Sequence, residues 1–65
     1  MKLIVNGKIR EVRAATLDRL LAELEYEGSW LATARNGDLV PARERPECRL
    51  TEGDRIEILS PMQGG

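Results

Sequence analysis

The stretch KLIVNGKIREVRAATLDRLLAEL, residues 2–24, changes its hydrophobic period halfway along. Its first half has two aliphatic runs on either side of Asn6-Gly7. This pair favours a two-residue type I′ hairpin turn, because both turn positions need positive φ. Its second half has leucines at positions 17, 20, 21 and 24, the i, i+3, i+4, i+7 spacing of a helix with one apolar face. The stretch therefore predicts a β-hairpin followed by an amphipathic helix.

The two strands of this hairpin differ in their patterns. In the first strand, Leu3 and Val5 are two residues apart, so they should share one face of the sheet. In the second strand, Ile9 and Val12 are three residues apart, so strict alternation fails. We therefore expect the second strand to contain a bulge or to end early.

The helix has recognisable start and stop signals. Thr16 is the predicted N-cap, and Asp18 in the first turn suits the positive end of the helix dipole. The helix should cover residues 17–26, with Gly28 as its C-terminal stop.

A second hairpin is predicted around Asn36-Gly37, in the segment WLATARNGDLVPA. The small side chains of Ala32 and Ala34 would let a helix lie close to this hairpin. Pro41 cannot donate a ladder hydrogen bond, so the second arm should be a short edge strand.

The last third of the chain contains a loop and a final strand. Residues 41–49, PARERPECR, hold two prolines, three arginines and two glutamates, which predicts a solvated loop with room for one 3₁₀ turn. Its arginines indicate a wet surface more than a binding patch. After a turn at residues 52–54, residues 55–60 alternate, with Ile56 and Ile58 on one face and Leu59 on the other.

The order of elements is strand, strand, helix and then three strands, which leaves one helix to cover one sheet face. This order predicts an α+β fold with a mixed sheet of four to five strands and one main helix packed on one face. Residues 1–60 should form the domain, and residues 61–65, PMQGG, a flexible C-terminal tail, because proline and glycine cannot usefully extend a strand. The predicted core is Leu3, Val5, Leu17, Leu20, Leu21, Leu24, Ile56 and Ile58.

Composition excludes several classes of function. Ten basic and eleven acidic residues give a net charge of −1, without the basic excess of a nucleic-acid-binding protein. No apolar run is long enough for a membrane span or a signal peptide, so we place the protein in the cytoplasm. There is no histidine and Cys48 is the only cysteine, which argues against a metal site and a histidine-dependent nucleophile. We expect no catalytic residue and no chemistry at Cys48, a small semi-buried side chain.

The whole chain resembles the ubiquitin-like β-grasp proteins and, among them, the ThiS family of the ThiS/MoaD superfamily. The matching stretches are VNGK after the first strand, TLDRLLAEL on the helix, ARNGDLVPA across the second turn, EGDRIEIL on the last strand, and the final Gly64-Gly65. Each motif alone has little specificity, but their order and spacing cover essentially the whole chain.

The resemblance implies a sulfur carrier of thiamine biosynthesis, which is a co-substrate and not an enzyme. An E1-like adenylyltransferase of the ThiF type would use ATP and magnesium to adenylate Gly65, and no cofactor would be bound by the carrier itself. A sulfurtransferase or cysteine desulfurase would supply the sulfur of a Gly65 thiocarboxylate, which a ThiG-type thiazole synthase would consume. Gly64 would let the tail enter a narrow cleft, because it has no Cβ. Leu59 and Met62 are candidates for partner docking, or else ordinary exposed apolar side chains.

Other functions share this fold and tail. The chain could be a MoaD-like carrier of molybdopterin synthase, a carrier for cysteine or another thiometabolite, or a ubiquitin-like modifier joined to lysines. It could also be a passive β-grasp binding module, for which the tail would be dispensable.

Overall fold

The computed structural model describes residues 1–27 and 30–60, which form five strands and two helices. In chain order they are β1 (Lys2–Val5), β2 (Lys8–Glu11), α1 (Leu17–Glu23), β3 (Ala32–Arg35), β4 (Asp38–Val40), the 3₁₀ helix η1 (Ala42–Glu47) and β5 (Arg55–Leu59). The strands form one sheet in the order β2-β1-β5-β3-β4. β1 and β5 are parallel and the other neighbouring pairs are antiparallel.

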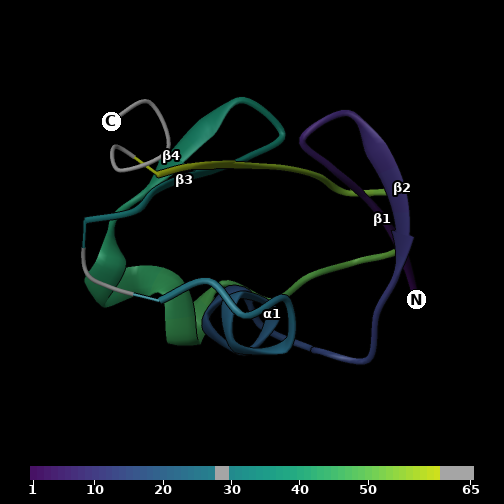
Figure 1. Cartoon of the computed structure of the whole chain (residues 1–65), viewed down its shortest axis with the longest axis horizontal. Coiled ribbons are helices and arrows are strands. Elements are labelled where there is room, and N and C mark those ends of the chain that lie inside the picture. The colour runs from purple at the N-terminus through teal and green to yellow at the C-terminus, as the bar shows by residue number, and fades with distance from the viewer. Residues whose placement is uncertain (28–29, 61–65) are drawn as a thin grey trace.

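The sheet arches over α1 and η1, which lie on the same side of it (Figure 1). The predicted α+β class, the mixed sheet and the helix on one face are therefore confirmed. Within the described residues, no helix is both long and apolar enough to cross a bilayer. The predicted tail, residues 61–65, lies outside the described part of the chain.

Both Asn-Gly pairs form the predicted tight turns. Asn6 and Gly7 have φ values of 50° and 83°, and Asn36 and Gly37 have 52° and 89°. Positive φ at both central positions matches the right-handed twist of the flanking strands. β2 ends at Glu11, so the early strand end is the correct alternative.

The helix begins as predicted but ends sooner. Thr16 is the N-cap with extended backbone, although its hydroxyl donates to the Asp18 carboxylate and accepts no capping hydrogen bond from a backbone amide. The helix stops at Glu23 and not at residue 26, because Glu25 turns to φ 66°. The Glu25 amide then donates to Ala22 at 3.1 Å and the Tyr26 amide to Leu21 at 2.8 Å. This pair of bonds is a Schellman ending, formed without glycine; the predicted stop, Gly28, lies outside the described residues.

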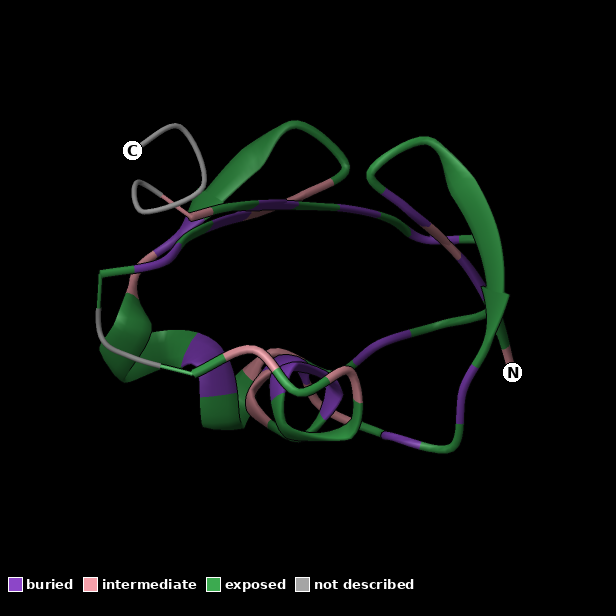
Figure 2. Ribbon diagram, viewed as in Figure 1, coloured by how far each residue is buried: buried purple, intermediate pink, exposed green. Residues whose placement is uncertain are grey.

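The core is aliphatic and lies between the sheet and the helices (Figure 2). Seven of the eight predicted core residues are buried. Leu24 is only partly buried, because it is the C-cap beyond the last helical turn. The prediction missed five buried residues in loops and at element ends: Val12, Ala14, Leu31, Val40 and Leu50.

The two small residues of β3 face away from the helix, contrary to expectation. Thr33 is opposite Ile58 in the ladder and is only 2% exposed. Ala32 and Ala34 therefore lie on the opposite, open face of the sheet. The buried Thr33 hydroxyl remains satisfied, because it donates to the Val40 carbonyl at 2.7 Å.

The segment predicted as a solvated loop contains the 3₁₀ helix η1, longer than the single turn expected. One of its arginines, Arg45, is buried and not solvated as predicted, since it is only 7% exposed. The Arg45 guanidinium donates to the Leu31 carbonyl at 2.6 Å and to the Thr33 hydroxyl at 3.1 Å. These bonds tie η1 to the strand β3, and this is why the arginine is buried.

Candidate functional site

The predicted site begins where β5 ends. β5 lies in the middle of the sheet, between β1 and β3, and its last residue, Leu59, is 68% exposed. Leu59 is thus a free apolar side chain on the open face, as a docking residue would need to be. Met62, Gly64 and Gly65 lie outside the described residues, so their predicted roles stay predictions.

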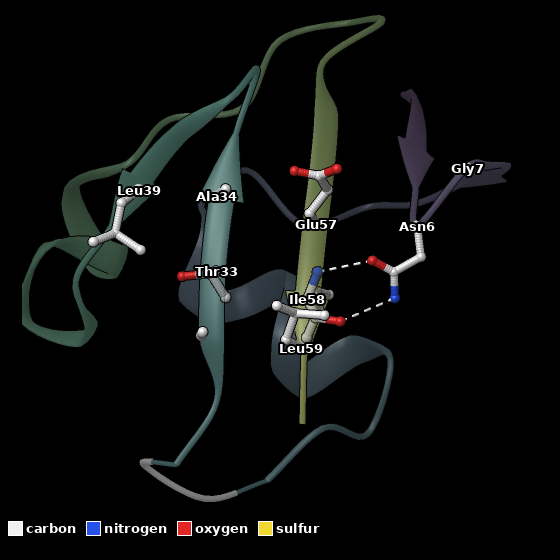
Figure 3. Close-up of a pocket in the computed structure, with 9 residues that line it drawn as sticks. Asn6, Gly7, Thr33, Ala34, Leu39, Glu57, Ile58 and Leu59 are labelled. Atoms are coloured by element: carbon white, nitrogen blue, oxygen red, sulfur yellow. Dashed lines mark hydrogen bonds between the residues drawn. The ribbon is translucent and has the colours of Figure 1, made fainter. Parts of the chain in front are cut away.

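The end of β5 is held by the side chain of Asn6. β1 runs parallel to β5 only as far as the pair of Val5 and Ile56, because the chain then turns away at Asn6. The Asn6 carboxamide replaces the missing strand. Its Oδ1 accepts the Ile58 amide hydrogen at 2.8 Å, and its Nδ2 donates to the Ile58 carbonyl at 3.2 Å (Figure 3). This bidentate pair fixes the direction of β5 at its last residues.

The start of β5 is held by a second asparagine side chain, that of Asn36. Its Oδ1 accepts the Arg55 amide hydrogen at 2.8 Å, and its Nδ2 donates to Asp54 at 3.1 Å. Asp54 is 6% exposed and also accepts from Arg35 Nε at 2.9 Å and from the Thr51 amide at 2.8 Å. Burial acts to raise the pKa of Asp54, but the hydrogen bonds from Thr51, Asn36 and Arg35 prevail and lower this pKa below its ordinary value.

A groove of about 530 Å³ lies on the open face beside the end of β5. Ala32 and Ala34 lie along it, and Leu39 of β4 and Leu59 are its large apolar side chains (Figure 3). Glu57 is the one charged side chain among the described residues that line it. Leu39 is 72% exposed and Leu59 68%. Glu57 lies in the cross-strand row of Leu39, beyond Ala34, and two residues before Leu59 on β5.

Sequence reasoning identified Leu59 but missed Leu39 and Glu57. The alternation of β5 already places Glu57 and Leu59 on one face. However, the link to Leu39 depends on β3 pairing with β5, which brings together strands about 20 residues apart in the chain. Leu39 and Ala34 are a ladder pair, and Ala34 is opposite Glu57.

The remaining candidate group, Cys48, is half-buried and packs against the core. Within residues 1–27 and 30–60, no group of three or more His, Cys, Asp or Glu side chains could hold a metal ion. Glu57 is the one ionisable side chain among the described residues that line the groove.

Comparison with known proteins defines the family. The model of the ThiS family matches residues 3–65, which is nearly the whole chain and includes both final glycines. The chain belongs to the ThiS family. This confirms the family predicted from the motifs.

Individual ThiS relatives agree with this membership. The chain is 33% identical to the sulfur carrier protein ThiS of Thermus thermophilus over 61 residues, which cover 94% of the chain and 95% of that protein. It is also 35% identical over 66 residues to a thiazole synthase of Paramagnetospirillum magneticum. The match covers all of the chain but only 20% of that synthase, so the chain spans about a fifth of the length of this relative.

Two solved structures of a ThiS thiamine biosynthesis protein from Geobacter metallireducens have the same fold. The crystal structure superimposes with a TM-score of 0.83 at 29% identity, and the match covers both chains completely. The solution structure gives a TM-score of 0.81 at 29% identity and covers 100% of the chain and 88% of the other. These neighbours confirm the ubiquitin-like β-grasp fold. The ThiS family links this chain to sulfur carriage in thiamine biosynthesis.

Proposed function

We propose that the chain is a protein co-substrate that carries sulfur on the carboxyl group of Gly65. The observation that carries this proposal is the end-to-end match to a sulfur carrier protein ThiS, together with a family match that extends through Gly64 and Gly65. The exposed Leu59 at the end of β5 supports it, because a partner that docks there is only six residues from Gly65 in the sequence.

The proposed first step is activation of Gly65. An E1-like enzyme of the ThiF type binds ATP and magnesium, and a Gly65 carboxylate oxygen attacks the α-phosphorus and displaces pyrophosphate. A carboxylate is a poor electrophile, whereas the resulting acyl adenylate has AMP as a leaving group. The carrier needs no acid or base of its own in this step.

The proposed second step replaces AMP by sulfur. The terminal sulfur of a persulfide on a sulfurtransferase or cysteine desulfurase attacks the Gly65 carbonyl and expels AMP. A thiol then attacks the donor sulfur of the acyl disulfide, which releases the Gly65 thiocarboxylate and leaves a disulfide. The thiocarboxylate is a soft nucleophile suited to sulfur transfer.

A thiazole synthase is the proposed acceptor of the sulfur. The similarity of the whole chain to a fifth of one thiazole synthase supports this partner, because a carrier-like segment there belongs to the same polypeptide as the rest of that protein. The five tail residues can span at most about 18 Å. The acceptor must therefore contact the domain near the end of β5. Leu59 is the proposed docking residue, together with Met62 three residues later in the sequence.

The test is intact mass after incubation with ATP, magnesium, the activating enzyme and a sulfur source. We expect one oxygen of the chain to be exchanged for sulfur. Deletion of Gly65 should abolish ATP–pyrophosphate exchange, since the carboxylate would be about 3.6 Å short of the nucleotide. Gly64→Val should be nearly as harmful, because a β-branched side chain restricts the backbone and adds bulk. Isopeptide adducts on lysines would instead identify a protein modifier, and exchange at the wild-type rate without Gly65 would refute the proposal.

A further inference from the structure

Glu57 is an acidic side chain that forms no ion pair within residues 1–27 and 30–60, on a groove whose other described lining residues are uncharged. It lies in one cross-strand row with Ala34 and Leu39, and Leu59 follows it on the same face (Figure 3). Of the described residues that line the groove, only Glu57 is charged. Water solvates its carboxylate in the free protein, because the side chain is exposed.

The neighbours of Glu57 explain why the described part of the chain supplies no counter-ion. On one side the ladder places Ala34 opposite Glu57. On the other side β1 has already ended, and the side-chain amide of Asn6 is hydrogen-bonded to the backbone of Ile58. Arg55 is on the same face two residues earlier, but among the described residues the ion pairs are those of Arg35 with Asp54 and of the Met1 amino group with Glu11.

Glu57 shares a cross-strand row with Leu39, with Ala34 between them, and it lies two residues before Leu59 on the same face of β5. A partner that covers both leucines therefore also removes water from Glu57. A carboxylate that loses water without gaining a cation opposes binding strongly. From this, and resting on the proposed function, we infer that the activating enzyme inserts an arginine or lysine side chain into the groove to pair with Glu57. Apolar side chains around that cation cover Leu39 and Leu59.

The shape of the groove fits such a side chain. Ala32 and Ala34 present only methyl groups, so an aliphatic stem can lie across them while its cationic head reaches the carboxylate. The activating enzyme is the chosen occupant because it must grip the domain while the tail reaches its nucleotide. The tail begins directly after Ser60. Its five residues can extend over at most about 18 Å.

The experiment measures ATP–pyrophosphate exchange by the activating enzyme at increasing carrier concentration, for wild type, Glu57→Gln and Glu57→Lys. We expect Glu57→Lys to raise KM about tenfold or more and Glu57→Gln several-fold, with kcat little changed, because the pair acts in docking and not in chemistry. The rise of the wild-type KM with salt should be weaker in Glu57→Gln. The matched control is Glu47→Lys, the same charge change at an exposed residue of η1, on the other side of the sheet, and its KM should stay within about twofold of wild type.

Thermal melts of all variants check that they are folded. Glu57 is exposed, so its substitution removes no contact with the core. If wild type supports no exchange, the proposed function fails and this inference falls with it. If wild type is active but Glu57→Lys behaves like Glu47→Lys, the inference alone is overturned. A lower KM for Glu57→Gln would also overturn it, since the carboxylate would then oppose docking.

Discussion

Asp54 is the residue on which most of the polar contacts around β5 converge. Its Oδ2 accepts from Arg35 Nε and the Thr51 amide, and its Oδ1 accepts from Asn36 Nδ2 and the Thr51 hydroxyl. Both oxygens therefore face donors only. An ionised carboxylate is the group that suits four donors, and this explains why its pKa is lowered although burial opposes ionisation.

Asp54→Asn should destabilise the fold at neutral pH and flatten its pH dependence. An amide must turn an NH₂ group toward either pair of donors, which should lower the free energy of unfolding by about 1–3 kcal/mol at pH 7. Because the folded pKa is below the unfolded value, the ionised Asp54 stabilises the fold above about pH 4, and this contribution is lost as the pH falls further. Urea unfolding between pH 2 and 7 measures both effects.

The control for this prediction is Asp38→Asn, which neutralises an exposed carboxylate in the second turn region. It should leave the free energy of unfolding at pH 7 within about 0.5 kcal/mol of wild type. The account of Asp54 would be refuted if Asp54→Asn matched wild type at pH 7 and showed the same acid dependence.

At the scale of elements, α1 is a short helix stabilised by one buried face. Leu17, Leu20 and Leu21 are buried, and the helix ends at Glu23, three residues before the predicted end at residue 26. Tyr26 packs partly against the core immediately after the Schellman ending, which is the apolar contact that often accompanies this motif. The helix is therefore as long as its core contact requires.

Leu20→Ala and Leu24→Ala should differ sharply, although both remove the same atoms. Leu20 is fully buried, so its truncation should lower the free energy of unfolding by about 2–5 kcal/mol, a large share of the stability of so small a domain. Leu24 is only partly buried at the C-cap, so its truncation should cost clearly less. Equal losses in chemical denaturation would mean that the helix presents a different face to the sheet.

These elements also show what a single sequence can predict. The Asn-Gly turns, the N-cap at Thr16 and the alternation of β5 are local signals, and all were confirmed. The burial of Arg45 and the amide pairing of Asn6 with Ile58 were missed, because each depends on a strand distant in the chain. The prediction of the sheet face on which Ala32 and Ala34 lie was wrong for the same reason. The register of β3 with β5 decides this face, and the size of the side chains does not.

At the scale of the whole molecule, the chain places its first and last strands side by side at the centre of the sheet. β1 and β5 are parallel neighbours, so Leu3 and Val5 share the core with Ile56 and Ile58. The last buried residue in the chain is Ile58, among those the structure describes. Among the described residues the core is thus complete at Ile58. The proposed reacting residue, Gly65, stands five residues beyond Ser60 in the sequence.

Deleting residues 61–65 should therefore leave the domain folded while it abolishes activation. The last ladder pair is Ala32 with Leu59, so the free energy of unfolding should stay within about 0.5 kcal/mol of wild type. Deleting residues 58–65 instead removes Ile58, which is 4% exposed, and leaves the Asn6 amide without its partner. The longer deletion should remove most of the free energy of unfolding, which is expected to be roughly 3–10 kcal/mol for 65 residues. The chain should therefore unfold. Urea titration followed by circular dichroism compares the two, and a loss above about 1 kcal/mol in the shorter deletion would show that residues 61–65 belong to the folded domain.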